Sequence, residues 1–191
     1  MLKRRIGIAV ALICLIGLYA FRVYAVNTDI KLPIRQVYKK SEAVPYEKDF
    51  NTGTGSSDGY TVQVLDSKIM SAKDFCEKYN VTDMKLATHY YMVKVSVENI
   101  SNHHVGEEGV PLGISMLIGT NYCLIPSPDM FSAVNTDMPS QAFSLRLGTQ
   151  KEVWLVFQII PGVAPERKQI EEDPPMLQIT QYPHQKLIQL T

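Results

Sequence analysis

The chain opens with a long apolar stretch. Residues 6–21 (IGIAVALICLIGLYAF) hold no charged side chain, and Lys3, Arg4 and Arg5 precede them. At about 1.5 Å per residue this run makes roughly 24 Å of helix, and extension through Val26 gives about 31 Å, close to the thickness of a bilayer core. We therefore predict a signal-anchor or signal peptide in residues 1–26, in contact with a membrane through residues 6–26.

Two interpretations of this segment remain open. Small side chains at Val23 and Ala25 suit cleavage before Val26, which would give a secreted protein. Arg22 and the bulky Tyr24 suit a cleavage site poorly and favour an uncleaved anchor. We expect a single-pass protein of the cell membrane whose C-terminal domain is extracytoplasmic, with secretion after cleavage near Ala25 as the alternative.

The rest of the chain alternates apolar and polar residues in short runs. Residues 27–59 are mostly polar and end in a Gly/Ser-rich run, which predicts a flexible tether, so that the domain would span residues 60–191. The alternation predicts strands over residues 60–66, 91–99, 114–118, 122–125, 143–147, 151–160, 176–180 and 186–190. Since residues 151–160 are apolar on both faces, we expect them to form a central strand.

One helix interrupts these strands. Ser71 is a suitable N-cap for residues 71–80, and Asp74 stands at the third helical position, as in a capping box. No βαβ rhythm and no glycine-rich phosphate loop is found. The fold class is therefore mainly β, an antiparallel β-sandwich with one short helix.

Charge narrows the choice of partners. The formal net charge is zero, but residues 1–25 carry basic side chains and no acid, so the remainder is net acidic. Nucleic acid is not expected as a partner, because phosphate binding needs clustered Lys and Arg. A basic stretch (Lys31, Arg35, Lys39 and Lys40) could meet lipid headgroups or anionic wall polymers, or be a solvated linker.

Two signatures support a resemblance to a known group. A strand of the form V-x-V-x-V-x-N (residues 93–99) precedes a polar loop, and the Leu147-Gly148 turn precedes an aromatic-ended strand (residues 153–157). Residues 60–160 therefore resemble the immunoglobulin-like domains of unknown function in exported, membrane-anchored proteins of Gram-positive bacteria. The resemblance implies an immunoglobulin-like sandwich and an envelope location, and it implies no activity.

Three groups of residues are candidates for chemistry. His103, His104, Glu107 and Glu108 share one loop and offer ligands that Zn²⁺ accepts, although neighbouring side chains diverge and the loop could simply be solvated. Cys76 and Cys123 could form a disulfide in an oxidising compartment or remain buried thiols. Met130, Phe131 and Met138 could expose an apolar binding loop or fold over the core.

No catalytic motif emerges from these residues. The chain lacks a Gly-x-Ser-x-Gly elbow, and we expect neither a catalytic site nor a cofactor. We therefore expect a binding module whose partner is an envelope protein, a peptide or a wall component. An accessory subunit of a membrane transporter or sensor is the first alternative, and an enzyme with an unrecognised site is the second.

Overall fold

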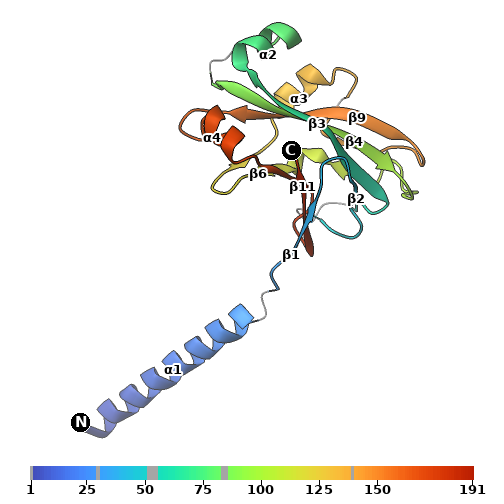
Figure 1. Ribbon diagram of the computed structural model, residues 1–191. Coiled ribbons are helices and arrows are strands. Elements are labelled where there is room, and N and C mark those ends of the chain that lie inside the picture. Colours follow the sequence, from blue (N-terminus) through green and yellow to red (C-terminus); the bar gives the residue numbers. More distant parts are fainter. Residues whose placement is uncertain (1, 29–30, 51–55, 83–85, 139) are drawn as a thin grey trace. The chain divides into compact units, whose positions relative to one another are not determined.

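The computed structural model describes residues 2–28, 31–50, 56–82, 86–138 and 140–191, apart from the side chains of residues 2–5 and 8–11. The chain divides into two compact units, Met1–Leu32 and Pro33–Thr191. The first unit holds one helix, and the second holds all the described strands and three further α-helices (Figure 1).

The N-terminal helix is α1 (Leu2–Thr28), as its uninterrupted run of apolar residues favours. In the part of the chain that the structure describes, no helix combines the length and the apolar character that crossing a bilayer requires. The segment expected in the membrane, residues 6–26, falls partly on residues 8–11, whose side chains lie outside the described residues.

Two larger sheets build the second unit. One has the order β1 (Ile34–Tyr38), β11 (His184–Gln189), β10 (Met176–Gln178), β6 (Met116–Ile118) and β7 (Cys123–Leu124). The other has the order β2 (Ala43–Pro45), β3 (Tyr60–Ser71), β4 (His89–Asn99) and β9 (Gln150–Ile159). The short strands β5 (Val110–Pro111) and β8 (Ala142–Phe143) form a separate pair, and only β1 and β11 pair in parallel among the named strands.

One buried cluster contains side chains from both larger sheets. Val93, Val95 and Val97 of β4 lie in it together with Leu177 of β10 and Ile188 of β11. The fold is therefore mainly β, as predicted. The immunoglobulin-like sandwich itself stays a prediction. Within the four-stranded sheet, the consecutive strands β3 and β4 pair directly.

A second buried cluster covers the other face of the four-stranded sheet. It joins Phe75 of α2 (Ala72–Tyr79) and Met130 of α3 (Pro128–Val134) to Met92 of β4 and Val156 of β9. Strand β9 was expected at the centre of a sheet because it is apolar on both faces. That prediction was wrong, since β9 ends the strand order and these helices bury its second face.

The predicted helix over residues 71–80 is confirmed as α2. Ser71 caps it by accepting a hydrogen bond from the Asp74 backbone N–H at 3.1 Å, and the left-handed Asn80 ends it. Two more helices lie where only loops were expected. These are α3 and α4 (Arg167–Glu172), the latter with a capping box between Glu166 and Gln169. A 3-10 turn, η1 (Leu112–Ile114), completes the described helices.

Residues 27–59 were expected to form a flexible tether, but most of this segment belongs to the folded unit. The folded unit begins at Pro33, and both β1 and β2 belong to its sheets. Each strand is too short to give a clear alternation, and each is held by a partner that sequence reading did not connect with it. Residues 29–30 and 51–55 of that segment lie outside the described residues.

The end of β4 is closed by a neutral hydrogen-bonded group, which we call the asparagine cluster (Asn99 and Asn102). The fully buried Asn99 donates from Nδ2 to the carbonyls of Asn102 (2.9 Å) and Leu145 (2.7 Å). Asn102 in turn donates to the Asp58 carbonyl at 2.8 Å. Gly59 is required beside it, because a Cβ there would lie 2.5 Å from the Asn102 nitrogen.

Candidate functional site

A cluster of charged side chains surrounds a lysine at the centre of β11. Lys186 is fully buried, and by strand alternation it shares a face with Ile188 and Leu190, which are buried as well. Strand β11 therefore carries an ammonium group into the apolar interior. A buried cation must be paired and hydrogen-bonded, because burying an isolated charge is very costly.

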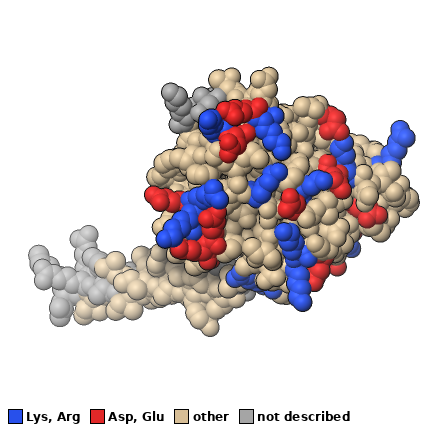
Figure 2. Space-filling model, turned by 45° about the horizontal axis from the view of Figure 1, so that its top comes forward, with Lys and Arg blue, Asp and Glu red and all other residues tan. Residues whose placement is uncertain are grey.

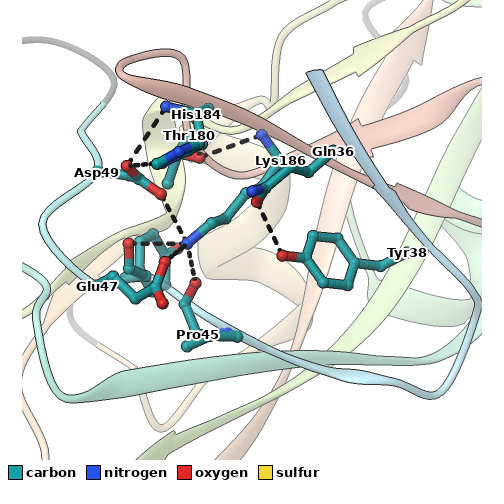
Figure 3. Close-up of polar contacts among 9 residues, drawn as sticks. Gln36, Tyr38, Pro45, Glu47, Asp49, Thr180, His184 and Lys186 are labelled. Carbon is teal, nitrogen blue, oxygen red and sulfur yellow. Dashed lines mark hydrogen bonds and ion pairs between the residues drawn. The ribbon is translucent and has the colours of Figure 1, made fainter. Parts of the chain in front are cut away.

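The partners of the Lys186 ammonium come from residues 45–49, at the end of β2 and just after it (Figure 3). Its Nζ donates to the Pro45 carbonyl at 2.7 Å and to the Glu47 carboxylate at 2.7 Å, and it lies 3.3 Å from the Tyr46 carbonyl. Asp49 Oδ2 forms an ion pair with the same nitrogen at 2.6 Å. We call Glu47, Asp49, His184 and Lys186 the lysine cluster. It ties the beginning of the folded unit to its last strand.

Asp49 links the two basic side chains. Its side chain is only 3% exposed, and its Oδ1 lies 2.9 Å from Nδ1 of His184. Burial would raise the pKa of Asp49, but hydrogen bonds from Lys186 and His184, with the charges of both, outweigh this penalty and lower the pKa below its ordinary value. Asp49 is therefore a carboxylate at neutral pH.

The lysine cluster also contains a set of metal-ligating atoms. Glu47, Asp49 and His184 each offer one ligand atom, and these atoms lie within 4.8 Å of one another. The Lys186 ammonium already stands 2.6–2.7 Å from both carboxylates, where a cation would bind. A divalent ion at the same place would be repelled by that charge. The cluster is thus built around its own lysine rather than around a metal.

Sequence reading missed the lysine cluster, although one signal was present. Residues 186–190 read as a strand, and in that strand Lys186 falls on the same face as Ile188 and Leu190. A lysine on an apolar face indicates a buried, paired ammonium. The identity of its partners could not be read, because Glu47 and Asp49 lie at the other end of the folded unit.

The loop that was predicted to bind a metal does not bring its four candidate ligands together. His103, His104 and Glu107 are exposed, and the Glu108 carboxylate accepts a hydrogen bond from Asn102 Nδ2 at 2.7 Å. His103, His104 and Glu108 border one polar hollow. Within the described ranges, however, the metal-ligating group with mutually close atoms is that of the lysine cluster, and the loop residues do not form one.

The predicted apolar binding loop packs inward. Met130 is 4% exposed and Phe131 is fully buried, because α3 lays both side chains against the sheets. Met138 is partly buried against the first core cluster. These three residues therefore belong to the core and do not form an exposed apolar surface.

The predicted cysteine pair is not joined. Cys76 lies buried in α2, within the second core cluster, whereas Cys123 is exposed on β7. The Cys123 sulfur lies 3.6 Å from the sulfur of Met116. No disulfide therefore links Cys76 to Cys123 among the described residues.

An exposed edge lies beside the lysine cluster. Strand β1 ends its sheet, and the side chains of Ile34 (60% exposed) and Val37 (49% exposed) are open to solvent. The Ile34 N–H donates inward to the Pro183 carbonyl at 3.0 Å. Because main-chain groups alternate sides along a strand, the N–H and C=O groups of Arg35 and Val37 face away from β11. We call this feature the β1 edge.

Two aromatic rings adjoin the start of the β1 edge. Phe50 and Tyr182 are 43% and 39% exposed, and their ring centroids are 5.8 Å apart. Phe50 donates its backbone N–H to the Tyr182 carbonyl at 2.8 Å, and Tyr182 directly precedes the Pro183 that binds Ile34. An open strand edge and exposed apolar side chains thus occur together.

Comparison with known proteins identifies the family of this chain. Residues 35–186 match a family model described as a domain of unknown function, DUF5028. This match covers most of the chain, and the protein therefore belongs to the DUF5028 family. No curated protein and no solved structure gives a significant match.

Proposed function

We propose that this chain is a non-enzymatic binding module of the cell envelope that captures an extended segment of a partner protein along the β1 edge. The observation that carries this proposal is the open outer side of β1 in the described part of the fold. An extended peptide can add one strand to such an edge, gaining affinity from main-chain hydrogen bonds and specificity from alternate side chains.

The chemistry around the edge describes its partner. Val37 and the Phe50–Tyr182 pair offer apolar contacts, and Arg35 and Lys39 are exposed and basic. We therefore expect an extended segment with apolar and acidic residues. On the face seen in Figure 2, basic and acidic side chains are interspersed, and neither kind forms a patch of its own.

The envelope location rests on the sequence. The uncharged run over residues 6–21 and the basic residues before it are typical of an exported or anchored chain. For the fold, we propose that the two larger sheets face each other as an immunoglobulin-like sandwich. The shared buried cluster of Val95, Leu177 and Ile188 supports this arrangement.

A crosslinking experiment tests the binding mode. A photoreactive residue in place of Ile34, which is 60% exposed on the same edge, in the full-length protein activated in its native membranes should give an adduct with an acidic, extended segment of one protein. Val37→Pro removes an outward N–H that β11 does not use, and it should abolish the adduct. Val105→Lys changes a valine of nearly equal exposure (47% against 49%) in the loop between β4 and β5, and it should leave the adduct intact. An adduct that persists in Val37→Pro would overturn strand addition.

A further inference from the structure

We propose that Lys186 and Asp49 of the lysine cluster condense to an amide that crosslinks the two ends of the folded unit. The Lys186 side chain is fully buried, the Asp49 side chain is 3% exposed, and Nζ lies 2.6 Å from Oδ2. Amines and carboxylates do not condense in dilute water. A fixed approach of two buried side chains replaces the bimolecular encounter and holds the amine beside the carboxyl group.

Glu47 can accept the proton that must leave the ammonium before the amine attacks. Its Oε2 lies 2.7 Å from Nζ of Lys186, which is within direct transfer distance. The Glu47 side chain is 61% exposed. Glu47 is therefore open to water and suits the role of a base better than that of the electrophile.

His184 can activate the carboxyl group of Asp49. Its Nδ1 lies 2.9 Å from Oδ1, opposite the oxygen that Lys186 contacts. With a proton on Nδ1, the imidazole donates to Oδ1 and stabilises the negative charge that develops there when the carbonyl carbon is attacked. Asp49 thus has a nucleophile on one oxygen and a hydrogen-bond donor on the other, which Glu47 does not.

The step is balanced without any co-reactant. The ammonium gives one proton to Glu47, and the neutral amine forms a bond from Nζ to Cγ of Asp49. The C–Oδ2 bond then breaks, and this oxygen leaves as water with the proton held by Glu47 and the second proton of the amine. One ammonium and one carboxylate become one amide and one water, and Glu47 is regenerated.

The position of the bond gives it a structural consequence. Asp49 follows β2 near the start of the folded unit, and Lys186 lies on its last strand, which pairs with β1. A covalent link there closes almost the whole folded unit into a ring. It would hold β11 and the segment after β2 together even in denaturant, because the bond is covalent. It would also stabilise the fold, because a crosslink lowers the conformational entropy of the unfolded chain.

Mass spectrometry of the purified full-length protein tests the amide. We expect the intact mass to fall below the sequence mass by one water molecule, with fragmentation joining the peptide that contains Asp49 to the one that contains Lys186. Lys186→Arg keeps the positive charge but cannot form this bond, and it should show its full mass. Glu47→Gln changes an exposed side chain and should slow the loss of water at least tenfold.

The outcomes separate cleanly. A wild-type protein that keeps its full mass after prolonged incubation at neutral pH overturns the proposal. A loss of water that maps to any other pair of residues, including Glu47 with Lys186, overturns it as well. The result does not depend on the stability of Lys186→Arg, because the crosslinked peptide is identified in the wild-type chain.

Discussion

Two polar clusters hold loops in place within this fold, and they do so with different chemistry. The asparagine cluster is built on two uncharged side chains. Asn99 binds backbone groups near the end of β4, and Asn102 also donates to the Glu108 carboxylate. The lysine cluster is charged and joins Lys186 to Glu47 and Asp49. Neutral amide networks are stable over a wide pH range, whereas buried ion pairs depend on every partner staying charged.

The two clusters also differ in the sequence separation that they bridge. Asn99 and Asn102 are three residues apart, and they reach the Leu145 and Asp58 carbonyls, 46 and 44 residues away. The lysine cluster joins segments from the two ends of the folded unit. The asparagine cluster thus links the end of β4 to neighbouring loops, whereas the lysine cluster links the first and last parts of the folded unit. If the clusters differ in energy as well as in topology, substitutions in them should differ in their cost and in their pH dependence.

The largest effect is expected from Lys186→Met. This change fits the apolar interior but leaves the buried Asp49 carboxylate without its main partner, and it should cost about 3–5 kcal/mol of unfolding free energy. Equilibrium denaturation with urea measures the loss, with Glu47→Gln present in both chains so that the ion pair, not the amide, is compared. A cost below about 1 kcal/mol would show that the lysine cluster does not stabilise the fold.

A smaller loss is expected from Asn99→Ala. The substitution leaves the Asn102 N–H and the Leu145 carbonyl without this partner in a buried position, at a cost of about 2 kcal/mol. Urea denaturation at pH 7 and at pH 3 should give nearly the same difference from wild type, because no charge is removed. A difference that changes strongly with pH would contradict the neutral character of this cluster.

The pH dependence should distinguish the lysine cluster. The pKa of Asp49 is lowered in the folded state relative to about 3.9 in the unfolded chain, so its contribution is complete above about pH 5 and is lost as the pH falls through the folded value. Each pKa unit of lowering is worth ~1.4 kcal/mol. Urea denaturation from pH 7 to pH 2 should show this loss in Glu47→Gln.

Two chains serve as controls for that pH experiment. Adding Asn at position 49 to the Glu47→Gln chain removes the titrating group, so the loss below pH 4 should shrink. A wild-type chain in which the Lys186–Asp49 amide has formed should lack the contribution of Asp49 altogether. Equal slopes in all three chains would show that another carboxylate controls the acid response.

The smallest effect is expected from Lys168→Met, the same substitution as at Lys186 but on the surface. Lys168 lies 3.8 Å from Glu172, and both side chains are largely exposed. Solvent-exposed pairs of this kind contribute little, and the change in unfolding free energy should stay within about 0.5 kcal/mol. A larger loss, measured by the same urea titration, would show that burial is not what distinguishes the lysine cluster.

Much of the secondary structure could be predicted because its signals are local. The alternation over residues 91–99 gave β4, with Val93, Val95 and Val97 in the core, and Ser71 with Asp74 marked the start of α2. The loops that became α3 and α4 were missed because these helices are short. Helices of one or two turns are stable only when packed or capped, which a local pattern does not show.

The candidate sites could not be predicted in the same way. The metal loop and the apolar loop were chosen because their residues are close in sequence, yet the structure leaves His103 exposed and buries Phe131. The lysine cluster was missed because Glu47 and Asp49 lay in a segment expected to be a tether. A site whose halves come from both ends of a domain leaves no spacing in the sequence.

The sequence by itself determined the β-rich class, the long N-terminal helix and the inward faces of the principal strands, since each follows from the order of neighbouring side chains. Only the tertiary structure decided that residues 34–38 are a sheet edge, that β9 is buried from both sides without being central, and that Lys186 meets Asp49. Those outcomes depend on contacts between distant segments, whose loop-closure entropy is repaid only by the completed fold.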